Sequence, residues 1–82
     1  MDSVAAMKRS VSIQGHQTSI SVEDAFWTEF RAISARQNRA LASLIAEIDA
    51  ARPADANLSS AIRLFVLADL RRRLAEAEAT SS

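Results

Sequence analysis

Residues 15–30 read GHQTSISVEDAFWTEF, and this stretch contains the step that decides the fold. In its first half, polar residues alternate with β-branched residues, which is typical of a strand with one buried face. From the second half onward, Phe26, Phe30 and Ile33 recur at intervals of four and three residues, as apolar residues do on one face of a helix. The stretch therefore predicts a strand that leads directly into a helix.

A second alternating run, KRSVSI at residues 8–13, precedes this strand. Gly15 followed by His16 suits a two-residue type II′ hairpin loop between the two runs. Pairing outward from that loop separates the side chains into an apolar face and a polar face. The apolar face holds Val11, Ile13, Thr18, Ile20 and Val22, and the polar face holds Ser10, Ser12, Gln14, Gln17, Ser19 and Ser21.

Three helices are predicted after the strands, each from apolar residues spaced by three and four. Ser21, Asn38 and Asn57 are residue types that cap helix N-termini, and Pro53 favours the end of the second helix. We expect strands over about 8–13 and 17–22 and helices over about 23–36, 38–51 and 58–75. These elements make one domain over 8–75, between a flexible tail at 1–7 and a frayed tail at 76–82.

Composition narrows the function. The chain has 82 residues, no cysteine, one histidine and one glycine, so a thiolate metal site and a glycine-rich phosphate loop are excluded. No set of side chains suggests catalysis, and we expect a protein without enzymatic activity, metal or cofactor. Ten basic and ten acidic residues give a formal net charge of zero, whereas nucleic-acid-binding domains usually carry a basic excess. Chains this short often gain buried area from a partner chain.

Neither a signal peptide nor a membrane-spanning run is recognisable in the sequence. We therefore expect a cytoplasmic protein, associated with the nucleoid if it binds DNA.

Three segments, KRSVSIQGHQTSISVEDAFW, LIAEIDAAR and NLSSAIRLFVL, resemble a family of small bacterial ribbon-helix-helix proteins found mainly in alphaproteobacteria. The resemblance covers roughly residues 8–72. It implies a mainly helical α+β fold, namely a ribbon-helix-helix domain with an added third helix, in an intertwined homodimer. In that fold an antiparallel two-stranded ribbon enters the major groove of double-stranded DNA.

The resemblance also assigns candidate roles. Base contacts are expected from Gln17, Ser19 and Ser21, since Gln and Ser can hydrogen-bond to base edges. Phosphate contacts are expected from Lys8, Arg9, Asn38 and Arg39. The resemblance also places a phosphate on the backbone N–H groups near Asn38, Arg39, Ala40 and Leu41, at the start of the second helix, where anions are favoured. The dimer core is expected to contain Ile20, Val22, Phe26, Phe30, Leu44, Ile48 and Phe65.

The sequence leaves two functions open. The first is a homodimeric, sequence-specific DNA-binding protein that regulates transcription. The second is a protein-interaction dimer on the same fold, an adaptor or antitoxin-like protein, whose third helix binds a protein partner. Two features weigh against the first function: the reading strand carries no Lys or Arg, and a first strand beside the ribbon would broaden the sheet.

Overall fold

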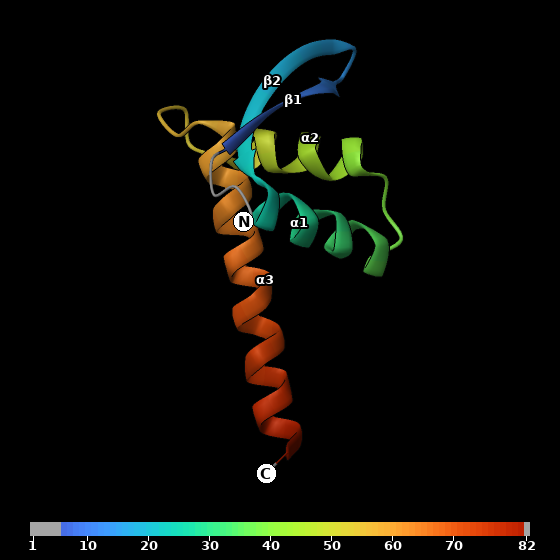
Figure 1. The fold of residues 1–82 in the computed structure, drawn as a ribbon, viewed down its shortest axis with the longest axis vertical. Coiled ribbons are helices and arrows are strands. Elements are labelled where there is room, and N and C mark those ends of the chain that lie inside the picture. Colours follow the sequence, from blue (N-terminus) through green and yellow to red (C-terminus); the bar gives the residue numbers. More distant parts are fainter. Residues whose placement is uncertain (1–5, 82) are drawn as a thin grey trace.

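A computed structural model describes residues 6–81 of the chain. An antiparallel hairpin, β1 (Ala6–Ile13) and β2 (His16–Glu23), is followed by α1 (Asp24–Arg36), α2 (Leu41–Ala51) and α3 (Leu58–Ser81), as Figure 1 shows. The predicted order of two strands and three helices is thus confirmed. Of the predicted tail at 1–7, residues 6 and 7 belong to β1 and the rest lies outside the described residues.

The hairpin turn lies one residue earlier than predicted. Ile13 pairs with His16, so the two loop residues are Gln14 and Gly15, with φ angles of 50° and 84°. Positive φ at both central positions is the signature of a type I′ turn, whose twist matches that of the strands. Gly15 adopts such a φ at low cost, and Gln14 accepts it because the strand pairing fixes the turn. The predicted Gly15–His16 loop is therefore wrong.

The core lies between the inner face of the hairpin and all three helices. Ile20 and Val22 contribute from β2, and Phe30 is fully buried in α1. The ring of Phe30 meets Trp27 at a centroid distance of 5.9 Å and Phe65 of α3 edge-on at 6.0 Å. Of the residues predicted for a core, Ile20, Val22, Phe30, Leu44 and Ile48 are buried, and Phe26 and Phe65 are partly buried against them.

The break between α1 and α2 differs from the prediction. Asn38 has a φ of 53°, its N–H donates to the Ala35 carbonyl, and the N–H of Arg39 donates to the Ser34 carbonyl. These two hydrogen bonds around a left-handed residue form a Schellman motif, which ends α1. Asn38 therefore closes the first helix instead of capping the second, and α2 begins at Leu41.

The other two predicted caps have opposite outcomes. Ser21 lies within β2, and the N-cap of α1 is Glu23, without a side-chain capping hydrogen bond. Asn57 does cap α3, because its Oδ1 accepts the N–H of Ser60 at 2.7 Å. The prediction of a cap from the local sequence was correct for α3, which the chain enters from a loop. It was wrong for α1, where a strand runs directly into the helix.

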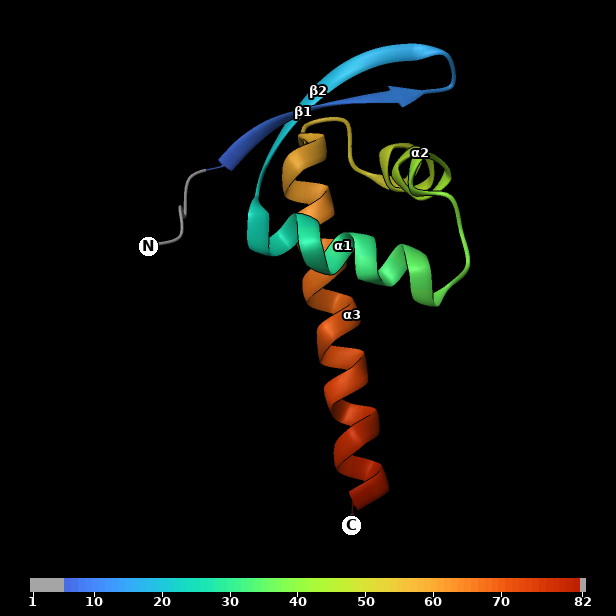
Figure 2. The same ribbon diagram turned by 45° about the vertical axis from the view of Figure 1, so that its right-hand side comes forward.

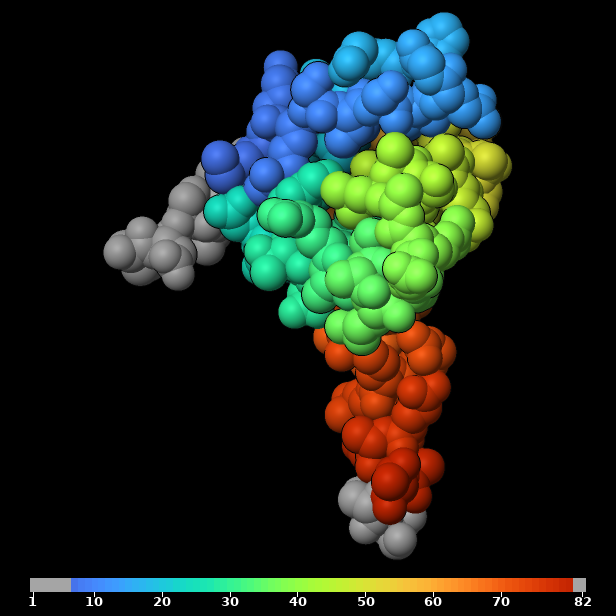
Figure 3. Space-filling model, turned by 90° about the vertical axis from the view of Figure 1, so that its right-hand side faces the viewer, coloured from blue at the N-terminus to red at the C-terminus, as the bar shows by residue number. Residues whose placement is uncertain are grey.

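The third helix is longer than predicted and continues to Ser81 instead of ending at residue 75. Its first half packs on β2, α1 and α2, and its second half projects away from them (Figures 1 and 2). The hairpin covers the opposite end of the molecule, as the space-filling view in Figure 3 shows. The outer face of the hairpin and the C-terminal end of α3 therefore point in opposite directions.

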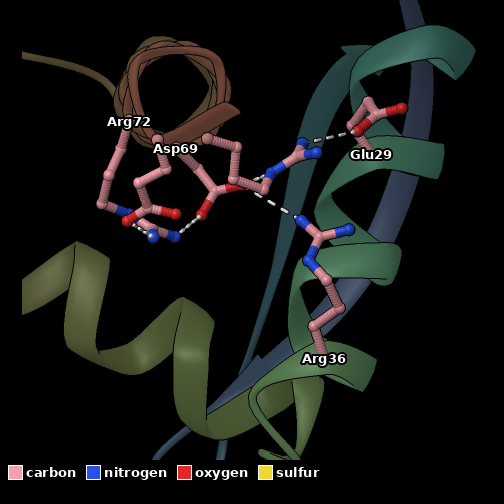
Figure 4. Close-up of polar contacts among 6 residues, drawn as sticks. Glu29, Arg36, Asp69 and Arg72 are labelled. Atoms are coloured by element: carbon pink, nitrogen blue, oxygen red, sulfur yellow. Dashed lines mark hydrogen bonds and ion pairs between the residues drawn. The ribbon is translucent and has the colours of Figure 1, made fainter. Parts of the chain in front are cut away.

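A buried carboxylate fixes α3 against α1 (Figure 4). Asp69 is 7% exposed and accepts hydrogen bonds from Arg36 of α1 at 3.1 Å, Arg72 at 2.7 Å and Arg73 at 2.8 Å. Burial acts to raise the pKa of Asp69, but the hydrogen bonds from Arg73 and Arg72 outweigh it and hold this pKa below its usual value. Arg73 also reaches Glu29 of α1, at 3.4 Å.

Candidate nucleic-acid interface

The outer surface of the hairpin, called the ribbon face below, is polar over its whole length. Each of its side chains is exposed, whereas Ile20 and Val22 between them point inward and are buried. The type I′ register shifts the strand pairing by two residues relative to the prediction, and an even shift leaves every side chain on its face. The ribbon face consists of Lys8, Ser10, Ser12, Gln14, Gln17, Ser19 and Ser21.

The strand pairing places the three predicted base-contacting residues beside polar partners. Ser19 lies directly opposite Ser10, and Gln17 lies directly opposite Ser12. The Ser10 hydroxyl donates to the Oε1 of Gln17 at 3.2 Å, which orients the amide while leaving the NH₂ group available. The two strands together present a band of hydroxyl and amide groups, so β1 contributes to this face as much as β2.

The two predicted basic residues of the first strand lie on opposite faces. Lys8 lies opposite Ser21 on the ribbon face. Arg9 lies opposite Ile20, forms an ion pair with Asp24, and stacks over the Trp27 ring at 4.8 Å from its centroid. Arg9 therefore ties the hairpin to α1, and Lys8 is the basic side chain that accompanies the candidate base-contacting residues.

One end of the outer edge of β2 is held by α3, which the sequence did not indicate. The backbone N–H of Ser21 donates to Ser59 Oγ at 3.0 Å, and Arg63 donates to the Ser21 carbonyl at 3.2 Å. Arg63 also donates to Glu23 at 2.8 Å, and this hydrogen bond lowers the pKa of Glu23. A partner strand pairing with the whole of β2 would displace these contacts.

Farther along the same edge, the segment between α2 and α3 leaves a shallow cleft of about 430 Å³ beside Thr18, Ser19 and Ile20. The backbone N–H and C=O groups of Gln17 and Ser19 point away from β1 here, in the same direction as those of Ser21. Unlike the groups of Ser21, those of Gln17 and Ser19 have no hydrogen-bond partner within residues 6–81. This part of the edge is therefore accessible.

The start of α2 was predicted to bind phosphate through backbone N–H groups near Asn38, Arg39, Ala40 and Leu41. The N–H groups of Asn38 and Arg39 are already used in the Schellman motif. The N-cap of α2 is Ala40, which makes no side-chain cap, so the N–H groups of residues 40–43 have no partner within the described chain. An anion at this helix start would meet these groups and the exposed hydroxyl of Ser43.

Arg39, beside this helix start, is engaged by an acidic residue. Its guanidinium makes two hydrogen bonds to Glu47, of 3.1 and 2.9 Å, which lower the pKa of Glu47 and raise that of Arg39. The pair is largely solvent-exposed, so it holds Arg39 only weakly.

Most of the remaining positive charge is neutralised in the same way. Ion pairs engage seven of the ten Lys and Arg side chains, and within residues 6–81 only Lys8, Arg31 and Arg71 make none. The described residues contain neither a cluster of three potential metal ligands nor a helix able to span a membrane.

Comparison with known families identifies the chain. A family model described as a ribbon-helix-helix domain matches residues 6–70, from the start of the hairpin to the middle of α3. No curated protein and no solved structure matches the chain at a significant level. Members of the family are typically DNA-binding transcription regulators or antitoxins, and their fold is not an enzymatic one. The match covers most of the chain, which therefore belongs to the ribbon-helix-helix domain family.

Proposed function

We propose that the protein is a homodimeric, sequence-specific DNA-binding regulator whose ribbon face enters the major groove. The observation that carries the proposal is the uninterrupted exposed polar surface on the hairpin of a ribbon-helix-helix chain. Gln17, Ser19 and Ser21 contact base edges, and Lys8 contacts a neighbouring phosphate. The open N–H groups at the start of α2 bind a second phosphate. Such a protein acts in the cytoplasm, where the DNA is.

The ribbon in this proposal is the β1–β2 hairpin of one chain. The major groove is about 12 Å wide and admits a two-stranded ribbon, whereas a four-stranded sheet is too broad for it. The contacts of Ser59 and Arg63 with Ser21 favour keeping β2 paired with β1 alone. Each subunit of a dimer then supplies one ribbon to one half-site.

Binding to duplex DNA at several salt concentrations tests the proposal. Phosphate contacts release counterions, so the affinity is expected to fall roughly 100-fold between about 50 and 200 mM salt for about four contacts. Competition between unrelated duplexes then measures sequence preference. Binding that is absent at low salt, or that does not respond to salt, contradicts the proposal.

Gln17→Ala is expected to reduce sequence preference. A bidentate Gln–adenine contact contributes about 1–3 kcal/mol of discrimination, which the alanine variant loses, while its affinity for unrelated sequences stays unchanged. Binding to a selected site and to a scrambled site, measured for both proteins, checks this. Gln37→Ala makes the same chemical change outside the ribbon face and serves as the control. Equal losses on both sites would assign Gln17 a role that does not depend on sequence.

Glu47→Gln is expected to strengthen binding to all DNA sequences. The substitution releases Arg39 from its ion pair, so the guanidinium can contact a phosphate near the start of α2. One added phosphate contact raises affinity roughly fivefold at low salt and steepens the salt dependence by about one unit. Glu76→Gln removes the same charge from the Arg72 pair on α3 and controls for net charge. If both variants gain equally, the effect is one of net charge and Arg39 has no special part.

A second function, a protein-interaction dimer, is favoured by a separate observation. Most basic side chains are occupied in ion pairs, and a row of leucines is exposed along α3. Absence of DNA binding together with stoichiometric co-purification of another protein would favour this function over DNA binding.

A further inference from the structure

The ribbon face contains a side-chain hydrogen bond that joins its two strands. The Ser10 hydroxyl of β1 donates to the Oε1 atom of Gln17 of β2 at 3.2 Å, and both residues are exposed. Within residues 6–81, the hydroxyl groups of Ser19 and Ser21 make no hydrogen bond. Among the three candidate base-contacting residues of the described chain, Gln17 is therefore the one whose side chain is held by a neighbour.

The hydrogen bond runs diagonally across the hairpin. Gln17 lies directly opposite Ser12, and Ser10 lies directly opposite Ser19. Diagonal neighbours on one face of an antiparallel pair lie about 7–8 Å apart, within reach of a long side chain. The bond therefore draws the Gln17 amide from β2 toward β1. The amide lies at the centre of the surface that the proposed function turns toward the bases.

The contact leaves the Gln17 amide able to recognise adenine. An amide oxygen has two lone pairs and Ser10 uses one of them, so the second lone pair and the NH₂ group stay free. In the major groove adenine presents an acceptor, N7, beside a donor, the N6 amino group, and a Gln amide matches both at once. Guanine presents two acceptors, N7 and O6, so a single Gln amide meets one of them with its own oxygen. An amide held in place therefore favours adenine.

Holding the amide also has an energetic consequence. A free Gln side chain samples several rotamers, and fixing it on binding costs affinity. A free side chain can also swing aside and donate one hydrogen bond to an acceptor of guanine. The amide held by Ser10 is ordered before DNA arrives, and it must break the 3.2 Å hydrogen bond to swing aside. Both effects raise the affinity for adenine relative to guanine.

We propose that Ser10 is a positioning residue for base recognition, which holds the Gln17 amide in the orientation that pairs with adenine. The inference rests on the proposed DNA-binding function and deepens it, because the preference at one base pair then belongs to two residues on two strands. It gives β1 a part in sequence recognition, whereas the resemblance assigned base contacts to residues of β2 alone.

Ser10→Thr and Ser10→Val test the role of the hydroxyl as a matched pair. The two side chains have nearly the same shape and both suit a strand, but only threonine can donate to Gln17. Affinity is measured for a selected duplex and for the same duplex with guanine in place of the adenine whose contribution Gln17→Ala removes. The valine variant is expected to lower the adenine-to-guanine affinity ratio roughly threefold to tenfold, and the threonine variant to keep the wild-type ratio.

The same two substitutions in a Gln17→Ala background show whether Ser10 acts through Gln17. With the amide removed, the threonine and valine variants are expected to have the same adenine-to-guanine ratio. A difference that persists without the amide overturns the inference, since Ser10 then acts by another route. Equal ratios for the threonine and valine variants with Gln17 present also overturn it.

Relaxation of the Gln17 side-chain NH₂ group in nuclear magnetic resonance spectra tests the contact without DNA. In the wild type and the threonine variant, this group is expected to be more ordered than that of the exposed Gln37. In the valine variant it should be as mobile as that of Gln37. Equal mobility in all three proteins overturns the inference, whether or not the protein binds DNA. An ordered amide in a protein that binds no duplex contradicts the proposed function and with it this role of Ser10. DNA binding with equal ratios for the threonine and valine variants contradicts the role of Ser10 alone.

Discussion

Replacing Phe30 with alanine is expected to lower the free energy of unfolding by about 3–5 kcal/mol. The side chain is fully buried and contacts Trp27 of its own helix and Phe65 of α3, so it joins the two helices at the centre of the core. Its removal leaves a cavity that neighbours on three helices and a strand cannot fill together. The loss is a large part of the 5–15 kcal/mol by which domains of this kind are stable.

Urea unfolding at a fixed protein concentration measures this loss, and the concentration is fixed because association of the proposed dimer would contribute to stability. Phe26→Ala is the matched control, since Phe26 lies one turn earlier in α1 but is only partly buried. The Phe30 variant should lose at least twice as much stability as the control. Equal losses would show that the buried position of Phe30 is not what makes it important.

Asp69→Asn is expected to destabilise the protein by about 2 kcal/mol at neutral pH. The amide cannot balance the three guanidinium groups that now converge on the carboxylate, and charge-assisted hydrogen bonds are about twice as strong as neutral ones. The loss stays below the 3–5 kcal/mol of a fully buried pair because the three arginines are partly exposed. Glu76→Gln, which alters only an exposed pair with Arg72, should change stability by less than about 0.5 kcal/mol.

The pH dependence of the stability difference between the wild type and Asp69→Asn tests whether this difference is electrostatic in origin. The pKa of Asp69 is lower in the folded protein than its usual value of 3.8. The carboxylate therefore contributes its full stability above that pH, and the contribution is lost as the pH falls through the folded pKa. Thermal unfolding of the wild type and Asp69→Asn from pH 7 to pH 2 should show the difference shrinking at the acid end. A difference that stays constant over this range would indicate lost packing instead.

Much of the fold follows from the alternation of polar and apolar residues in the sequence. The predictions that failed depend on backbone geometry, which this alternation does not encode. The faces of β1 and β2 were predicted correctly although the turn was not, because the register moved by an even number of residues. The turn itself depends on Gln14 accepting a positive φ, for which its side chain gives no signal. Asparagine suits both a helix N-cap and a left-handed helix end, so the residue type alone does not distinguish these two roles at Asn38.

The candidate site was predictable to a similar extent. Alternation alone separates Lys8 from Arg9, since neighbouring residues of a strand point to opposite faces, so the placement of Arg9 was available from the sequence. The contacts of Ser59 and Arg63 with Ser21 were not available, because they join residues about forty positions apart. The same holds for Arg36 and Asp69, which meet only because α3 packs across α1.

The most direct test of the DNA-binding proposal is a map of backbone amide signals in nuclear magnetic resonance spectra, recorded as duplex DNA is added. The proposal predicts that the signals that shift belong to residues of the ribbon face, above all Gln17, Ser19 and Ser21, and to the first turn of α2. Signals of the projecting second half of α3 should remain in place. Shifts confined to α3, or no shifts at low salt, would contradict the proposal that this hairpin reads DNA.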